Sequence, residues 1–274
     1  MSEKIITLSH VSAGYGRGGK DKTEYVLKDF SLDIYEGRCL CILGSNGSGK
    51  TTLLRTIAGI LPSKGSISVC GHDMKTLNRK QIASYIAFLS QMSQVYFSYS
   101  VYETVMQGRY AAGQSGFMAD RGQDREIVEE TLKSLGLENI RNRQITELSG
   151  GQLQRVFLAR AMAQRSPILL LDEPMNHLDL KVQAEFMEYL GAFGNGEISF
   201  RDGKSYKPTI VGVFHDITLT ADIADDVAVL KGGELLFSGP KSEVLTKDSL
   251  LQAYDFDVAA HILERNKKSI SFFL

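Results

Sequence analysis

The segment Gly44–Thr51 places the strongest constraint on the fold. It reads Gly-Ser-Asn-Gly-Ser-Gly-Lys-Thr and matches the pattern G-x-x-x-x-G-K-[ST] at every fixed position. It follows Cys39–Leu43, an apolar run typical of a strand buried on both faces, and it leads into a helical pattern at Thr51–Ile60. A glycine turn with a surface lysine would explain the residues of the motif, but not the buried strand before it and the helix after it. Strand, glycine loop and helix in this order predict an α/β fold with a phosphate-binding loop.

The residue types of this loop suit a nucleoside triphosphate. Its glycines let successive backbone N–H groups point inward, and the helix N-terminus adds partial positive charge. Lys50 is expected to reach the β- and γ-phosphates, and the Thr51 hydroxyl is expected to bind Mg²⁺. The predicted ATP-binding residues of this segment are Gly44, Ser45, Asn46, Gly47, Ser48, Gly49, Lys50, Thr51 and Thr52.

Two further apolar runs, Ile168–Leu171 and Thr209–Phe214, have the same buried character, and polar residues follow each of them. Helical patterns between the runs favour a mostly parallel sheet with helices on its faces. Near the N-terminus, Lys4–Val11 and Tyr25–Tyr35 alternate apolar and polar residues. The predicted fold is therefore α/β, with a mostly parallel core sheet and an N-terminal antiparallel β layer.

The stretch between Gln91 and Glu147 differs from the rest, because Val101–Arg109 and Asp124–Leu135 have helical patterns and no buried strand is evident. We expect one domain, residues 1–274, with a core at about 1–91 and 166–274 and a helical insertion at about 92–165. Gly194–Lys207 is expected to form a surface loop or an extra hairpin, in which Glu197–Phe200 could be a short strand.

Composition excludes several classes of protein. The 31 basic and 32 acidic residues give a net charge of −1, which does not indicate a nucleic-acid groove or a polybasic membrane surface. The three cysteines are an odd number and form no C-x-x-C pair, so they fit neither a disulfide framework nor a zinc ribbon, and a reducing cytoplasm is expected. There is no signal-peptide pattern, and the longest apolar runs are strand-sized, so we expect no membrane crossing.

Two carboxylates follow the second buried run, in Asp172-Glu173-Pro174. The carboxyl end of a strand is where open α/β sheets bind ligands. We expect Asp172 to support the Mg²⁺ shell and Glu173 to polarise the attacking water. A lone Asp-Glu pair is more often a helix cap with a solvated neighbour, but the phosphate loop upstream favours catalysis.

A second anion-binding helix start is predicted at Leu148–Gln152, where a serine hydroxyl and two glycine N–H groups precede an amphipathic helix. An ordinary serine N-cap is the alternative interpretation. The sequence thus has two predicted phosphate-binding sites but only one G-K-T loop and one acidic strand end, which is a puzzle for a monomer.

The order of these motifs resembles the ATP-binding subunit of ABC transporters over nearly the whole chain. The pentapeptide Leu-Ser-Gly-Gly-Gln, between the phosphate loop and the acidic strand end, is highly specific to that family. The resemblance implies a P-loop NTPase fold of the ABC ATPase type with a helical subdomain, and an ATPase that uses ATP and Mg²⁺. It also implies a homodimer paired head to tail, in which the ATP of one subunit meets the signature residues of the other, Ser149, Gly150, Gly151 and Gln152.

The resemblance assigns roles to further residues. Tyr15 matches the aromatic residue that stacks on adenine, and His215 matches the histidine that contacts the γ-phosphate. Gln91 matches the glutamine that contacts Mg²⁺ and the water, and Asp179 matches the aspartate of the loop that crosses the dimer interface. A turn tyrosine, a surface glutamine and a helix-start histidine are the ordinary alternatives. The implied catalytic set is Glu173, His215 and Gln91, and the implied Mg²⁺ set is Thr51, Gln91 and Asp172.

Val101–Tyr110 is similar to the V-x-E-x-V-x-x-G-R-Y stretch of subunits that energise import of iron–siderophore complexes, haem and vitamin B12. Gly233–Tyr254 and Gln183 are also similar to that group. Departures from its pattern are Ala111-Ala112, Met175 and the long loop Gly194–Lys207. A generic amphipathic helix is the alternative interpretation of Val101–Tyr110.

The resemblance further implies two integral-membrane permease subunits, an extracytoplasmic substrate-binding protein and a place on the cytoplasmic face of the membrane. Two alternatives stay open: the ATPase of a zinc or manganese importer or of an exporter, and an ABC ATPase that acts on nucleic acid. The second usually needs another cassette, a long coiled coil or a basic face. This sequence has none of them, so no nucleic-acid partner is expected.

Overall fold

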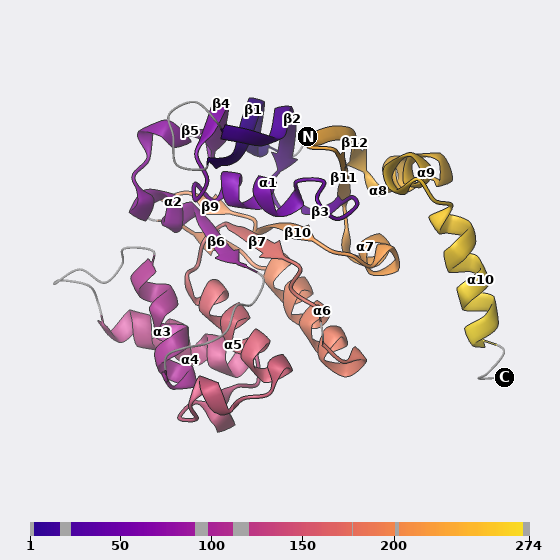
Figure 1. Cartoon of the computed structure of the whole chain (residues 1–274). Helices are drawn as coiled ribbons and strands as arrows, with labels where there is room; N and C mark the ends of the chain where they lie inside the picture. Colours follow the sequence, from indigo (N-terminus) through magenta and orange to yellow (C-terminus); the bar gives the residue numbers. More distant parts are fainter. Residues whose placement is uncertain are drawn as a thin grey trace.

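A six-stranded sheet lies at the centre of the protein, in the strand order β12-β11-β3-β10-β7-β6 (Figure 1). The structure is a computed structural model that describes residues 3–16, 23–90, 98–111, 121–176, 178–200 and 203–270. Neighbouring strands of this sheet are parallel except for β12, which pairs antiparallel with β11. The strands are β3 (Cys39–Leu43), β6 (Ile86–Leu89), β7 (Ile168–Asp172), β10 (Thr209–Val213), β11 (Asp226–Lys231) and β12 (Glu234–Pro240).

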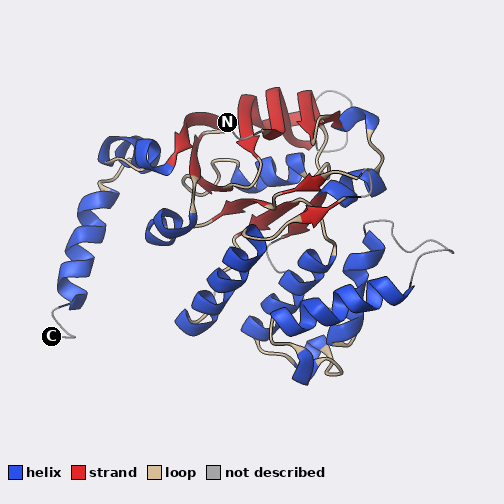
Figure 2. Ribbon diagram, turned by 180° about the vertical axis from the view of Figure 1, so that it is seen from behind, coloured by secondary structure: helices blue, strands red, loops and turns tan. Residues whose placement is uncertain are grey.

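An antiparallel sheet of order β2-β1-β4-β5 forms a separate layer above the central sheet (Figure 2). Its strands are β1 (Lys4–Gly16), β2 (Thr23–Tyr35), β4 (Ser63–Val69) and β5 (His72–Asp73). Helix α1 (Lys50–Ile57) lies between the two sheets and buries Leu53, Leu54 and Ile57. The predicted fold class, a mostly parallel core sheet with an N-terminal antiparallel layer, is confirmed.

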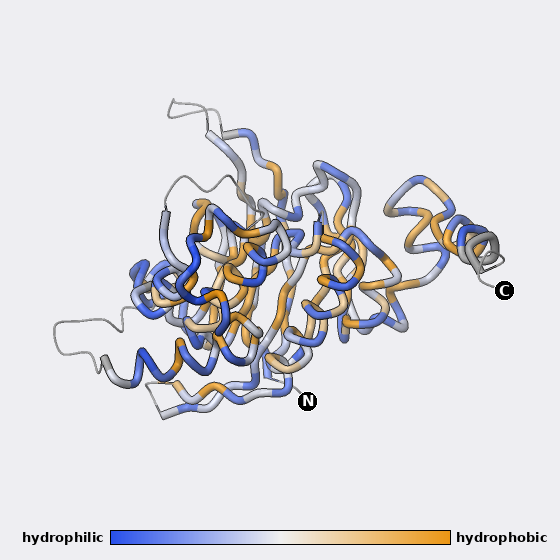
Figure 3. Tube along the Cα trace, turned by 90° about the horizontal axis from the view of Figure 1, so that it is seen from below, coloured by the Kyte–Doolittle hydropathy of each residue, from blue (hydrophilic) through white to orange (hydrophobic). Residues whose placement is uncertain are grey.

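The central sheet separates two hydrophobic cores. Because side chains alternate along a strand, Leu40 and Ile42 of β3 pack with α1 and the antiparallel layer, whereas Cys41 and Leu43 pack with helices on the opposite face. The same alternation holds in β7, and it explains why these strands are continuous apolar runs. In Figure 3 the hydrophobic colour is concentrated in the middle of the molecule, and hydrophobic and hydrophilic stretches alternate along the helices.

Helices gather on the face of the sheet opposite α1 (Figures 1 and 2). Three of them form a cluster below the β7–β6 side of the sheet: α3 (Val101–Ala111), α4 (Arg121–Ser134) and α5 (Gly150–Ala163). The C-terminal helices lie at the other end of the molecule. The remaining helices are α2 (Arg79–Tyr85), α6 (Leu180–Gly194), α7 (Ile217–Ile223), α8 (Lys241–Val244), α9 (Lys247–Tyr254) and α10 (Val258–Ile270), with short 3-10 turns at Met74–Thr76, Glu138–Ile140 and Ile145–Glu147.

The Val101–Tyr110 stretch is largely an interior packing element. Val101 and Val105 are buried, and a Cβ on Gly108 would lie 2.2 Å from the carbonyl oxygen of Arg160, so α3 and α5 approach closely there. Arg109 is only 1% exposed. Its Nε donates to Asp124 Oδ1 over 2.8 Å, and its Nη1 donates to the carbonyl of Ala163 over 2.7 Å. Much of this stretch therefore ties α3, α4 and α5 together.

Of the two structures expected for Gly194–Lys207, a surface loop or a hairpin, the structure has the hairpin: β8 (Ile198–Ser199), shorter than the suggested strand Glu197–Phe200, pairs antiparallel with β9 (Ser205–Tyr206). Aromatic contacts attach it to the body of the protein. Phe200 stacks on Tyr85 with ring centroids 4.7 Å apart and meets Tyr206 edge to face at 5.8 Å.

Most predicted elements agree with the structure. The predicted helix Thr51–Ile60 begins instead at Lys50 and ends at Ile57, because Gly59 adopts a φ of 67° that a helix cannot continue through. Strand β6 was not predicted, since its four apolar residues directly follow a helix. The division into a core and a helical insertion stays a prediction. No helix within the described ranges is long and apolar enough to cross a membrane.

Candidate active site

The predicted phosphate loop joins the carboxyl end of β3 to the start of α1. Gly44 has a φ of 146°, and a Cβ there would lie 2.2 Å from the carbonyl oxygen of Leu230. Gly49 precedes the helix with a φ of 103°, which other residues rarely adopt. The sequence requires glycine at both positions, so the loop curls tightly at the sheet edge.

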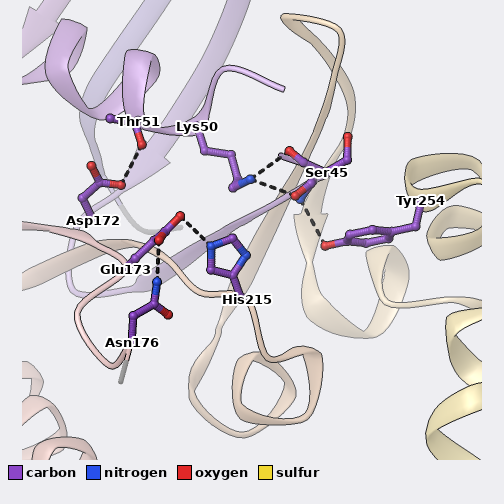
Figure 4. A network of polar contacts seen from close by, with 9 residues as sticks. Ser45, Lys50, Thr51, Asp172, Glu173, Asn176, His215 and Tyr254 are labelled. Carbon is purple, nitrogen blue, oxygen red and sulfur yellow. Dashed lines mark hydrogen bonds and ion pairs between the residues drawn. The ribbon is translucent and has the colours of Figure 1, made fainter. Parts of the chain in front are cut away.

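Lys50 points back across this loop (Figure 4). It is 6% exposed, and its Nζ donates to the carbonyl oxygens of Gly44 and Ser45, both at 2.9 Å. Burial lowers the pKa of Lys50, although the negative charges of Glu173 and Asp172 oppose this effect. The hydroxyl of Ser48 is buried and has no hydrogen-bond partner among the described residues. A buried ammonium and an unsatisfied hydroxyl at a helix start fit an oxyanion ligand such as a phosphate.

Asp172, the last residue of β7, lies beside this loop. It is 2% exposed, and its Oδ1 accepts a hydrogen bond from the Thr51 hydroxyl over 3.0 Å. Burial raises the pKa of Asp172, and the hydrogen bond from Thr51 partly offsets the shift. Such an oxygen pair suits Mg²⁺, which is usually held by one or two protein oxygens together with substrate phosphates. The described residues contain no cluster of three or more His, Cys, Asp or Glu that could hold a metal without a substrate.

Glu173 follows at once and has a backbone φ of 52°, a conformation uncommon for residues other than glycine. Its carboxylate is held from both sides (Figure 4): Oε1 bonds His215 Nε2, and Oε2 accepts from Asn176 Nδ2. Left-handed backbone at such a residue is a local strain that the surrounding structure must maintain. The carboxylate is therefore held in a defined position.

His215 reaches this carboxylate because β10 and β7 are adjacent parallel strands that end at the same edge of the sheet. Asp216, the next residue, caps α7 by accepting from the backbone N–H groups of Thr218 and Leu219 at 2.8 and 3.3 Å. This cap fixes where α7 begins and thereby the position of His215.

The pentapeptide Leu148–Gln152 begins α5 in the helical cluster, and within the chain it forms a capping box. Ser149 Oγ accepts from the Gln152 N–H over 3.3 Å, and Gln152 Oε1 accepts from the Ser149 N–H over 3.1 Å. A Cβ on Gly150 would meet nothing within 4 Å, whereas one on Gly151 would lie 3.1 Å from Val182. Gly150 therefore leaves room for a ligand to approach the helix start.

The other predicted residues lie apart from the Figure 4 network. Tyr15 is 44% exposed near the end of β1, and its hydroxyl accepts from Arg55 Nη1 over 3.3 Å. Asp179 caps α6 through a 2.9 Å bond from the Val182 N–H. Gln91 lies outside the described residues. The structure thus brings together Lys50, Thr51, Asp172, Glu173 and His215, and it places Tyr15, Asp179 and the pentapeptide elsewhere.

Three contacts at the site were not predicted. Asn176 stands in the motif after Glu173, but its spacing gave no reason to expect a bond to the carboxylate. Gln154 of α5 is buried, and its Nε2 donates to the carbonyl of Pro174 over 2.7 Å. Tyr254 of α9 places its hydroxyl oxygen 3.2 Å from the backbone nitrogen of Gly44. The last two join segments far apart in sequence, and no local pattern could have revealed them.

The comparison with protein families is decisive. A family model described as ABC transporter matches residues 27–176, more than half of the chain. The chain belongs to the ABC transporter family. It is an ATP-binding subunit of that family and an ABC-type ATPase.

Several relatives of this ABC ATPase are named as import ATP-binding proteins. The iron(3+)-hydroxamate import ATP-binding protein FhuC of Bacillus subtilis is 33% identical over 265 residues, covering 96% of this chain and 93% of the relative. The hemin import ATP-binding protein HmuV of Bradyrhizobium diazoefficiens is 32% identical, covering 94% and 91%. The cobalamin import ATP-binding protein BtuD of Halobacterium salinarum is 33% identical over 85% of this chain, which spans only 56% of that relative.

Solved structures of ABC cassettes resemble this ATPase closely. A dimeric structure of the ATP-binding cassette MJ0796, in a post-hydrolysis state bound to ADP and Pi, aligns with a TM-score of 0.71 at 29% identity. The alignment covers 86% of this chain and 98% of that one. The predicted P-loop NTPase fold of the ABC type is therefore confirmed.

Proposed function

We propose that this ABC ATPase energises the import of an iron(III)–siderophore complex or of a related metal chelate such as haem or cobalamin. The observation that carries the proposal is the set of relatives named for import of ferric hydroxamate, hemin and cobalamin, at 32–33% identity over most of the chain. The similarity of the Val101–Tyr110 stretch to the same subgroup supports the proposal. Its buried Arg109 is accounted for by packing within the chain and carries no information on the substrate.

In the proposed chemistry, Lys50 and the backbone N–H groups of the phosphate loop bind the triphosphate. Thr51 and Asp172, whose side chains are already hydrogen-bonded to each other, would hold Mg²⁺. The ion would supply positive charge to the phosphate oxygens. Glu173 polarises the attacking water and accepts its proton, while His215 holds the carboxylate in place and faces the γ-phosphate. Gln91 is proposed to complete the Mg²⁺ and water contacts, and Tyr15 to stack on adenine.

We expect the working unit to be a head-to-tail homodimer. Ser149, Gly150, Gly151 and Gln152 of one copy would contact the ATP bound at the partner's phosphate loop, and Asp179 would lie at the interface. The open space beside Gly150 supports this arrangement. Two MgATP would close the dimer and hydrolysis would reopen it, because each nucleotide then contacts both copies. Two permease subunits would convert this motion into transport, with an extracytoplasmic binding protein delivering the chelate and this subunit on the cytoplasmic face.

Replacement of Asp172 with Asn tests the proposed magnesium site. We expect the Mg²⁺ concentration for half-maximal ATP hydrolysis to rise by about 10- to 100-fold, as is typical when a group that supports a metal is lost. The metal-free variant should be at least as stable as the wild type at neutral pH, because burial raises the pKa of Asp172 and its charge is unfavourable in the folded state. Magnesium titration of hydrolysis and thermal unfolding in EDTA measure the two effects.

The exposed Asp29→Asn variant is the matched control for this substitution, since the carboxylate it removes is paired with His10 and with no residue of the site. An unchanged magnesium requirement in Asp172→Asn would contradict the proposed role of Asp172.

Transport assays on a deletion strain test the proposed substrate class. We expect deletion to abolish uptake of one of three labelled chelates, a ferric siderophore, haem or cobalamin, and the wild-type gene to restore it. Complementation with Glu173→Gln should fail to restore uptake, which links transport to hydrolysis. Normal uptake of all three chelates, with loss of zinc or manganese uptake instead, would overturn the proposal in favour of another importer.

A further inference from the structure

The C-terminal part of the chain contacts the phosphate loop directly. Tyr254, the last residue of α9, points its hydroxyl at the loop, and the backbone N–H of Gly44 donates to it over 3.2 Å (Figure 4). The two residues are 210 positions apart. The phenol is partly buried against the core, and burial raises the pKa of Tyr254, so its hydroxyl stays protonated.

Gly44 is also enclosed on the side where another residue would carry its Cβ. The Cβ position that glycine leaves empty is 2.2 Å from the carbonyl oxygen of Leu230 and 2.7 Å from Ser48 Oγ. The first peptide of the loop therefore fits between β11 and the rest of the loop, and its N–H bonds the C-terminal tyrosine. A shift of Tyr254 would change the direction of this peptide.

Lys231 fixes α9 in place. Its Nζ donates to the carbonyl of Gln252 over 2.8 Å and contacts both carboxylate oxygens of Asp255 at 2.7 and 2.8 Å. Asp255 ends α9 in a left-handed conformation, with a φ of 53°. Lys231 directly follows Leu230, so one short segment both encloses Gly44 and anchors the helix that carries Tyr254.

The same segment also contacts the other end of the phosphate loop. The N–H of Gly233 donates to the carbonyl of Ser48 over 3.1 Å, and the carbonyl of Gly233 accepts from the N–H of Lys28 over 3.1 Å. We call Lys231, Gly233, Tyr254 and Asp255 the C-terminal brace. The brace is hydrogen-bonded to the phosphate loop at Gly44 and at Ser48.

We propose that Tyr254 is a positioning residue for ATP binding, and that the placement of α9 sets the affinity of the phosphate loop. Tyr254 orients the peptide of Gly44, so that the N–H groups that follow it converge on the phosphates. Donors that are already aligned bind an anion more tightly than donors that must first be ordered. The C-terminal helices, which lie at the edge of the molecule (Figure 1), thereby affect ATP affinity without touching the nucleotide.

Tyr254→Phe tests this inference, because it removes the hydroxyl and keeps the ring. We expect the Kd for ATP, measured by calorimetry on the full chain in EDTA to prevent turnover, to rise about 3- to 10-fold, the effect of one lost hydrogen bond. At saturating ATP with Mg²⁺, kcat should stay near the wild-type value while KM rises. Tyr189→Phe is the matched control, since its hydroxyl makes a 3.4 Å bond to the carbonyl of Leu135 away from the loop. It should leave both constants unchanged.

Lys231→Met supplies an independent variant that releases α9 and leaves the phenol intact. It should also raise the Kd for ATP. The double variant with Tyr254→Phe should lose less binding free energy than the two single variants together, because both act through one contact. Wild-type Kd and KM in Tyr254→Phe, or a loss confined to kcat, would overturn the inference. The inference requires only that the chain binds ATP, so failure of the chelate-import proposal would leave these binding constants unaffected.

Discussion

Replacement of Glu173 with Gln is expected to lower kcat for ATP hydrolysis by about 10²- to 10⁴-fold, the usual contribution of a general base. The amide can still bond His215 and Asn176 but cannot accept the proton of the attacking water. Lys50 and Thr51 are unaffected, so ATP should bind normally. The variant should therefore accumulate as a closed dimer with MgATP, which size-exclusion chromatography detects as a species absent without nucleotide.

Glu138→Gln, at an exposed position in the helical cluster, is the matched control and should hydrolyse ATP at the wild-type rate. Normal turnover in Glu173→Gln would refute the assignment of Glu173. A variant that hydrolyses ATP slowly but stays monomeric with MgATP would support the assignment of Glu173 as the base and would refute the proposed dimer.

Replacement of Arg109 with Met is expected to lower the free energy of unfolding by about 3 to 5 kcal/mol, because it leaves the buried carboxylate of Asp124 without its partner. The variant also loses the bond to the carbonyl of Ala163, which ties α3 to the end of α5. Since native domains are stable by only about 5 to 15 kcal/mol, the helical cluster should unfold at a much lower urea concentration. Urea denaturation followed by circular dichroism measures the change.

The exposed ion pair of Arg165 with Glu130 provides the control, because the two side chains are 44% and 66% exposed. Arg165→Met should cost less than about 1 kcal/mol. The double variant Arg109→Met with Asp124→Leu should regain much of the lost stability, since no buried charge then lacks a partner. A loss in Arg109→Met no greater than in Arg165→Met would contradict the structural role of this pair.

The sequence predicted strands β3, β7 and β10 of the central sheet because a strand that is buried on both faces is apolar along its whole length. It did not predict β6, β11 and β12. Cys39–Leu43 is uniformly apolar since its alternate residues enter two different cores. The phosphate loop was equally predictable, because Gly44 and Gly49 occupy backbone conformations that other residues rarely adopt. In both cases a local requirement determines which residues are allowed.

Contacts between distant segments could not be predicted in this way. The left-handed backbone of Glu173 depends on its neighbours in β10 and in the following turn, and an acidic residue gives no sign of it. Helix caps show a different limit of prediction from sequence. Ser149 caps its helix as the ordinary interpretation holds, and Asp179 also proves to be a helix cap. A cap lies at a helix start, however, where a ligand or partner could bind. The two interpretations are compatible, and the sequence could not show this.

The bond from Gln154 to the carbonyl of Pro174 has a consequence for a pair of subunits. It ties the helix that begins with the signature pentapeptide to the turn directly after Glu173. In the proposed dimer, the pentapeptide contacts the nucleotide bound at the partner's phosphate loop, and Glu173 acts on the nucleotide bound at the subunit's own phosphate loop. One side-chain amide within a single subunit would then connect the two nucleotides of the pair, so that the loss of a γ-phosphate at one would alter the geometry of hydrolysis at the other.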